Sequence, residues 1–129
     1  MKPSELRIGN WYYDRTTSHE CDRQLTEELF RDEVLDRQCA YMSPIALNES
    51  WLERMPQIVA NGEEWNLHLQ NGEPTDVRMW KIKHFDGIML GIKWKGDYLT
   101  LSAVPNVHSL QNKIFALIDE ELEIKEEKS

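Results

Sequence analysis

The sequence predicts one α+β domain, in which an antiparallel β-meander of about four strands is covered by a C-terminal helix. Two observations lead to this fold class. Short segments with alternating apolar residues between positions 65 and 101 are separated by three turn sequences, which are Asn71-Gly72, Asp86-Gly87 and Lys95-Gly96-Asp97. Beyond them, apolar residues recur at helical spacing from Val107 to Ile118. Because a four-stranded sheet needs a cover over one face, we expect this helix to pack on the sheet.

The length of the chain fits one domain, and its charge and hydropathy argue against some classes of partner and some locations. The 129 residues suit a single domain, which we expect to span residues 1–125, followed by a frayed acidic tail at residues 126–129. With 15 basic and 23 acidic residues, the net charge of −8 opposes general binding to nucleic acid or to an anionic membrane. The sequence has no apolar run of membrane-spanning length, and its start lacks the apolar stretch of a signal peptide. We therefore expect a cytoplasmic protein.

The four strands of the meander follow from the alternation of apolar residues between the turns. In the first strand, Trp65, Leu67 and Leu69 are expected to point toward the core. The expected ranges are Trp65–Gln70, Val77–Phe85, Ile88–Lys95 and Tyr98–Leu101.

Two registers compete for the middle hairpin, and a slip of one residue between them would exchange its faces. A two-residue loop at Asp86-Gly87 would mix lysines with apolar residues on one face. A three-residue loop, residues 86–88, gives an apolar face instead, so we expect this register. Its cross-strand pairs are Trp80 with Trp94, Ile82 with Ile92, and His84 with Leu90.

Further elements are predicted outside the meander. A helix of two turns at most is expected near residues 49–55, because Asn48 can cap its first turn and Pro56 disfavours its continuation. A strand with a bend at Gly9 is expected near the N-terminus, and residues 15–43 remain without an assignment. N-terminal strands and a short edge strand at Leu122–Lys125 are the candidate extensions of the sheet.

Three segments of the sequence, each with its own motif, together carry a resemblance to a known group of proteins. They are Glu5–Asp14, Pro44–Leu52 and Val107–Leu117. In these segments the chain resembles a group of small uncharacterised proteins from phages and prophages of gut bacteria. The resemblance implies a mobile-element protein expressed inside a bacterial host, and small accessory proteins of that kind often bind host components. It implies no particular activity. Asp119 stands where the group has a helix-ending glycine, so the sequence does not fix the residue at which the C-terminal helix ends.

The expected C-terminal helix has a second face, formed by residues at helical spacing that are not part of the apolar stripe. They are His108, Gln111, Asn112 and Phe115. An imidazole, two amides and an aromatic ring can hydrogen-bond to and stack on a ligand, so this face is a candidate binding site. The competing interpretation is a half-exposed helix face whose amides bond to neighbouring loops.

The only local concentration of positive charge lies on the outward face of the middle hairpin. It comprises Lys81, Lys83, Lys93 and Lys95. Such a face suits an anion, for example a phosphate-bearing ligand, or an acidic protein surface. The competing interpretation is that these lysines are ordinary solvated side chains, which also prevent edge-to-edge aggregation of the sheet.

No metal or catalytic site is predicted. His19, Glu20, Cys21 and Asp22, taken together with Cys39, match no zinc-binding spacing. The sequence contains no glycine-rich phosphate loop, no GxSxG elbow and no HExxH motif. We therefore expect no enzymatic activity and no cofactor.

The leading hypothesis is a non-enzymatic binding protein of phage or prophage origin that engages a host macromolecule, with a host protein as its expected partner. Five tryptophans in so short a chain support it, since aromatic residues favour interfaces as well as cores. The alternative is a protein that binds or sequesters a nucleotide-like anion. A structural or virion-associated role is the third hypothesis, and the sequence leaves the oligomeric state open.

Overall fold

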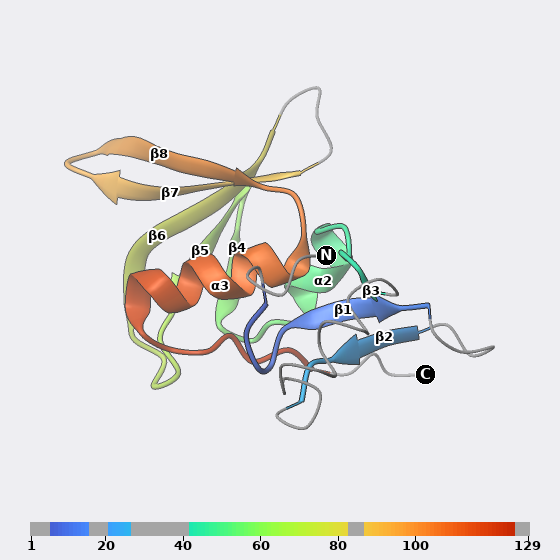
Figure 1. Cartoon of the computed structure of the whole chain (residues 1–129). Coiled ribbons are helices and arrows are strands. Elements are labelled where there is room, and N and C mark those ends of the chain that lie inside the picture. The colour runs from blue at the N-terminus through green and yellow to red at the C-terminus, as the bar shows by residue number, and fades with distance from the viewer. Residues whose placement is uncertain (1–5, 16–20, 27–41, 83–86, 126–129) are drawn as a thin grey trace.

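A computed structural model of the chain confirms the α+β class, with helices and two antiparallel sheets (Figure 1). The structure describes residues 6–15, 21–26, 42–82 and 87–125. Within these ranges the helices are α2 (Glu49–Glu53) and α3 (Val107–Ile118). The smaller sheet has the strand order β2-β1-β3 and consists of β1 (Trp11–Asp14), β2 (Cys21–Gln24) and β3 (Met42–Ser43).

The larger sheet is the predicted meander, with one strand more than expected. Its five strands are neighbours in chain order, and each pairs antiparallel with the next. The unpredicted strand is β4, in which only the first residue, Ile58, is buried, so that no apolar alternation reveals it. The strands are β4 (Ile58–Asn61), β5 (Glu64–His68), β6 (Pro74–Lys81), β7 (Ile88–Trp94) and β8 (Asp97–Val104).

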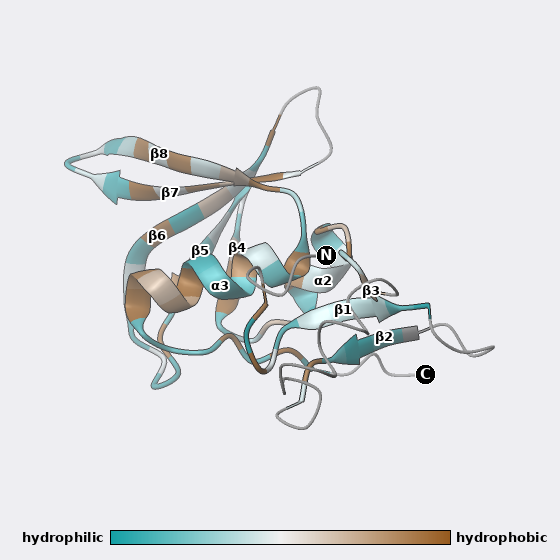
Figure 2. Ribbon diagram, viewed as in Figure 1, coloured by the Kyte–Doolittle hydropathy of each residue, from teal (hydrophilic) through white to brown (hydrophobic). Residues whose placement is uncertain are grey.

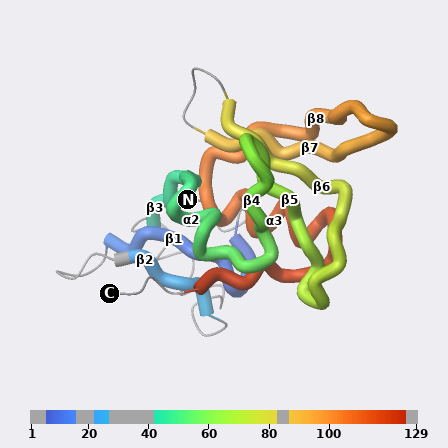
Figure 3. The backbone as a smooth tube through the Cα atoms, turned by 180° about the vertical axis from the view of Figure 1, so that it is seen from behind, coloured from blue at the N-terminus to red at the C-terminus, as the bar shows by residue number. Residues whose placement is uncertain are grey.

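Helix α3 runs along the inner face of the larger sheet, as predicted, and β1 of the smaller sheet also contacts it (Figures 1 and 3). Val107, Leu110 and Ile114 of α3 have no exposed surface, and they belong to one core cluster with Leu67 and Met79 of the sheet. Burial of these side chains removes apolar surface from water and supplies the main stabilising contribution to the fold.

Helices α2 and α3 both begin at an asparagine cap. Asn106 Oδ1 accepts a hydrogen bond from the Ser109 N–H at 3.1 Å, and Asn48 caps α2 in the same way, as predicted. Asp119 ends α3 in the left-handed conformation with φ of 56°, and its N–H donates to the Phe115 carbonyl at 2.8 Å. An aspartate therefore makes the turn for which a glycine is usual, and the predicted end of the helix at residue 118 is confirmed.

Both candidate extensions of the larger sheet are wrong. The N-terminal strands form the separate smaller sheet, and residues 122–125 are not a strand. The Glu123 N–H donates to Gln57 Oε1 at 2.9 Å, and the Lys125 N–H donates to the Arg54 carbonyl at 2.7 Å. Because these N–H groups bind a side chain and the end of α2, the segment packs beside α2 and does not join a sheet.

The register expected for the β6–β7 hairpin is also wrong. Met79 pairs with Leu90 and Lys81 pairs with Ile88, which matches neither of the two registers that the sequence suggested. The loop is longer than three residues, and its residues 83–86, which include His84, lie outside the described residues.

The observed register turns the odd-numbered residues of β6 toward the core. Val77 and Met79 are buried, whereas Trp80 lies on the outer face of the sheet. A Cβ atom added at Gly91 would lie 2.6 Å from Trp80 Cη2 and 2.6 Å from the carbonyl oxygen of Leu99. The missing side chain at Gly91 therefore provides the space that the Trp80 ring fills, and apolar alternation alone cannot detect such a fit.

Candidate functional site

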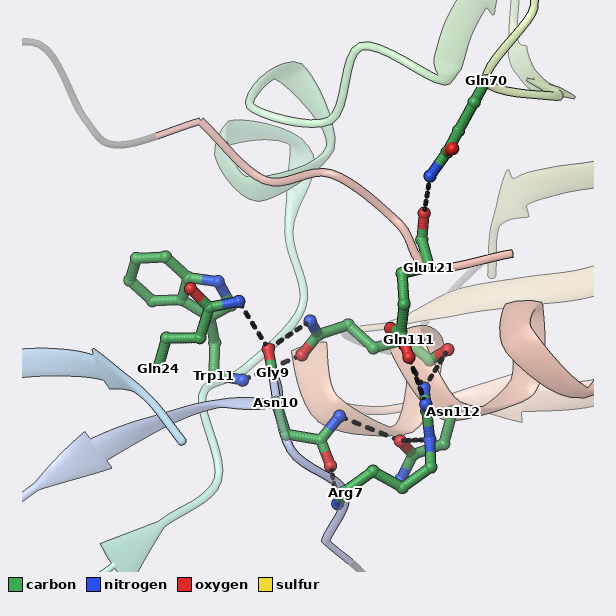
Figure 4. Close-up of polar contacts among 9 residues, drawn as sticks. All are labelled: Arg7, Gly9, Asn10, Trp11, Gln24, Gln70, Gln111, Asn112 and Glu121. Atoms are coloured by element: carbon green, nitrogen blue, oxygen red, sulfur yellow. Dashed lines mark hydrogen bonds and ion pairs between the residues drawn. The ribbon is translucent and has the colours of Figure 1, made fainter. Parts of the chain in front are cut away.

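The second face of α3 contacts the N-terminal segment of the same chain (Figure 4). Gln111 makes two hydrogen bonds to the backbone that leads into β1. Its Oε1 accepts from the Trp11 N–H at 2.8 Å, and its Nε2 donates to the Gly9 carbonyl at 2.9 Å. One buried amide thus satisfies a donor and an acceptor of the backbone.

Asn112 and Phe115 hold the preceding residues of the same segment. Asn112 Oδ1 accepts from Arg7 Nε at 2.8 Å and from Asn10 Nδ2 at 2.9 Å. The Arg7 guanidinium lies over the Phe115 ring, 4.2 Å from its centroid, and forms an ion pair with Glu121. A cation above an aromatic face and an ion pair together fix this arginine.

The structure brings the four predicted helix residues together, but against the protein itself. His108 and Gln111 are only 3% and 1% exposed, and Asn112 and Phe115 are half-buried. These contacts account for the amides and the ring without a ligand, which is the competing interpretation of this face. That the face binds a ligand stays a prediction.

The four lysines do not share one face of the hairpin. In the observed pairing, Lys81 lies on the core-facing side of the sheet and Lys93 on the other side. Lys81 forms an ion pair with Glu49 of α2, while Lys95 lies in the β7–β8 turn with φ of 49°. Lys83 lies outside the described residues. The shared lysine face is therefore wrong, because it depended on the wrong register, and the binding of an anion stays a prediction.

A different region is open to solvent. Every residue from Lys93 to Leu101 is exposed, and we call this outer part of the β7–β8 hairpin the arm. Figures 1 and 2 show it projecting beyond the body of the molecule, with apolar residues on both of its strands. Seven large apolar side chains are exposed among the described residues, and the arm carries four of them, which are Trp94, Tyr98, Leu99 and Leu101.

The arm includes an edge of the larger sheet. The strand order ends at β8, so in the described part of the chain no strand pairs with its outer edge. Over Asp97–Val104 the only charged residue is Asp97, and Trp94, which was expected in the core, is 58% exposed. Edge strands are normally protected by charge, by proline or by a covering segment. The strand β8 has little of this protection.

A groove of about 1100 Å³ lies next to the arm and is lined by residues from α2, the β4–β5 hairpin, β6 and β8. Its charged lining residues are one lysine and four glutamates, namely Lys81, Glu49, Glu53, Glu63 and Glu64. Its aromatic lining residues are Trp65, Trp80 and Tyr98. The groove is thus both negatively charged and aromatic.

Tyr98 connects the groove with the arm. Its hydroxyl donates to Glu64 Oε2 at 2.8 Å, and its ring meets Trp80 edge-on with 5.5 Å between the ring centroids. The hydrogen bond to the Glu64 carboxylate, with smaller contributions from burial and from the negative charge, raises the pKa of Tyr98 above its usual value of 10.0. The tyrosine therefore stays neutral and bonded to Glu64 at physiological pH.

Sequence reasoning missed both the arm and the groove. It placed Trp80 and Trp94 in the core, and it had no means of joining Glu53, on a helix, with Glu63, in a turn. The one available signal was the nine-residue stretch around Gly96, in which charged and apolar residues mix without a buried pattern.

Comparisons with protein-family models, with curated proteins and with solved structures gave no match. Within the described ranges, no helix has the length and apolar character needed to cross a membrane. The same residues contain no group of three or more His, Cys, Asp or Glu side chains placed to hold a metal ion.

Proposed function

We propose that this chain is a non-enzymatic binding protein of phage or prophage origin, which engages a host protein through the arm. The observation that carries the proposal is the concentration of exposed apolar side chains on one projecting hairpin. Exposed apolar side chains gathered on one element are typical of sites where proteins associate. The resemblance to phage and prophage proteins supports the choice of a bacterial host protein as partner.

The edge of β8 suggests how the partner binds. An extended segment of another protein can add to a free sheet edge through backbone hydrogen bonds, while pockets and side chains beside the edge provide specificity. The exposed Leu99 and Leu101 would contact such a segment from β8, and Trp94 would contact it from β7.

A partner of different sequence suits the arm better than a second copy of the chain. Each copy carries a net charge of −8, so repulsion between two copies opposes their association. No observation on the described residues favours the nucleotide-like anion as ligand, because Lys81 is paired with Glu49 and lies on the opposite face from Lys93.

The experiment is affinity capture from a bacterial lysate with three forms of the protein. The test variant is Trp94→Thr/Leu99→Thr, which removes two exposed apolar side chains from the arm and keeps strand-forming residues. The matched control is Ile8→Thr/Val59→Thr, which removes two exposed apolar side chains elsewhere. We expect one host protein to be retained by the wild type and by the control, and to be lost by the arm variant.

Two outcomes would contradict the proposal. One is that the wild type retains no host protein above background, while a known interacting pair in the same lysate is recovered. The other is that the arm variant and the control retain the same proteins as the wild type, because binding then does not use the arm.

A further inference from the structure

We propose that the groove beside the arm binds an extended segment of the partner that carries arginine or lysine side chains. This inference deepens the proposed function and rests on it for the identity of the partner. The binding of a cationic segment by the groove can nevertheless be tested without the arm.

Two of the four glutamates are available to a ligand. Glu49 is paired with Lys81, and Glu64 accepts the Tyr98 hydroxyl. Glu53 and Glu63 are exposed, and neither has an ion-pair partner among the residues that the structure describes. Guanidinium and ammonium groups are the protein side chains that such carboxylates bind most strongly.

The aromatic lining adds a second preference for cations. Trp65, Trp80 and Tyr98 line the groove, and a positive charge is attracted to the face of an aromatic ring. The same chain uses this interaction internally, since the Arg54 guanidinium lies 4.0 Å from the centroid of the Trp51 ring. A groove lined by both carboxylates and aromatic residues therefore favours arginine or lysine over a neutral side chain.

The size and position of the groove favour a chain segment over a small ligand. Its volume of about 1100 Å³ is at or above the upper end of the range for small-molecule pockets, and it opens to solvent. Because Tyr98 belongs both to β8 and to the groove, a segment that adds to β8 can continue into the groove. The hydrophobic residues of this segment would contact the arm, and the basic residues of the segment would contact Glu53 and Glu63.

The experiment measures the binding of a labelled peptide in which arginine and serine alternate, by fluorescence anisotropy with the full chain. A peptide of the same sequence with citrulline in place of arginine is the neutral comparison. The test variant is Glu53→Gln/Glu63→Gln. The matched control is Glu73→Gln/Asp76→Asn, which removes two exposed carboxylates outside the groove and changes the net charge equally.

We expect the arginine peptide to bind the wild type and the control alike, and to bind the Glu53→Gln/Glu63→Gln variant about fivefold to tenfold more weakly. Trp80→Leu should weaken binding about threefold or more, because the ring face is lost. The affinity should fall with added salt. Circular dichroism confirms that each variant remains folded.

Three results would overturn the inference. The first is that the citrulline peptide binds as tightly as the arginine peptide, and the second is that the control variant loses as much affinity as the groove variant. The third is that the arginine peptide does not bind the wild type at low salt. None of these three results depends on the arm. The Trp94→Thr/Leu99→Thr variant therefore separates the two proposals, because it should no longer capture the host protein but should still bind the arginine peptide.

Discussion

Helix α3 and the β7–β8 arm both carry side chains that suit recognition, and the structure uses them in opposite ways. The polar face of α3 is occupied from within, because Gln111 and Asn112 bind the residues that lead into β1. The arm has nothing over it in the described part of the chain, and its apolar residues are exposed. Polar side chains on a helix thus fix the chain to itself, while apolar residues in an exposed hairpin mark the free surface.

The largest effect is expected where the helix face holds the N-terminal segment. Gln111→Leu should lower the free energy of unfolding by about 3 kcal/mol, because the Trp11 N–H loses its buried acceptor and the Gly9 carbonyl loses one of its two donors. Denaturant unfolding measures the loss. The control is Gln24→Leu, since Gln24 is exposed and donates to the same Gly9 carbonyl, and its loss should be below about 1 kcal/mol. Equal losses in the two variants would mean that α3 does not fix this segment.

The next effect is expected where the arm joins the sheet. Gly91→Ala should lower the free energy of unfolding by about 2 kcal/mol, because the new methyl group would overlap the Trp80 ring and the Leu99 carbonyl. In a Trp80→Leu background the same change should cost less, since one of the two overlaps is relieved. Strictly additive losses in a double-mutant cycle would show that Trp80 does not occupy the space above Gly91.

A much smaller effect on stability is expected in the arm itself. Trp94→Thr/Leu99→Thr should change the free energy of unfolding by less than about 0.5 kcal/mol, because neither side chain is buried. Denaturant unfolding, run beside the Gln111→Leu variant, measures the difference between the two regions. A loss as large as that of Gln111→Leu would show that the arm stabilises the fold, and its exposed residues would then need no partner.

The smallest change is expected at Tyr98. Because the pKa of its hydroxyl is raised, the bond to Glu64 is present at neutral pH and is lost as the pH rises through the pKa in the folded protein, above 10.0. Glu64→Gln should return this pKa toward 10.0, since a neutral acceptor no longer opposes the loss of the proton. Ultraviolet titration measures the shift, with Tyr98→Phe identifying the signal. An unchanged titration in Glu64→Gln would contradict the Tyr98–Glu64 contact.

The parts of the fold that depend on local sequence were predictable. Helix α3 spans the residues over which apolar side chains recur at helical spacing, Val107 to Ile118, and Asn48 caps α2 as expected. The turns around Gly72 and Gly96 separate the strands that the apolar alternation indicated.

The parts that depend on contacts between distant residues were not predictable. The hairpin register was missed because the space above Gly91 accepts Trp80 on the outer face, and nothing in the alternation reports that space. The partner of the α3 face lies about a hundred residues away in the chain, at Arg7 to Trp11. The groove joins Glu53 and Glu63, which come close only after α2 and the β4–β5 hairpin have packed.

The most direct test of the difference between the two regions is site-specific photo-crosslinking in bacterial cells. The photoreactive residue p-benzoylphenylalanine is placed either at Leu99 in the arm or at Phe115 on the α3 face, and adducts are detected by their mass. We expect a heavier adduct with a host protein from position 99 and only intramolecular products from position 115. Adducts from position 115 but not from position 99, or an adduct of two copies of the chain, would contradict the account.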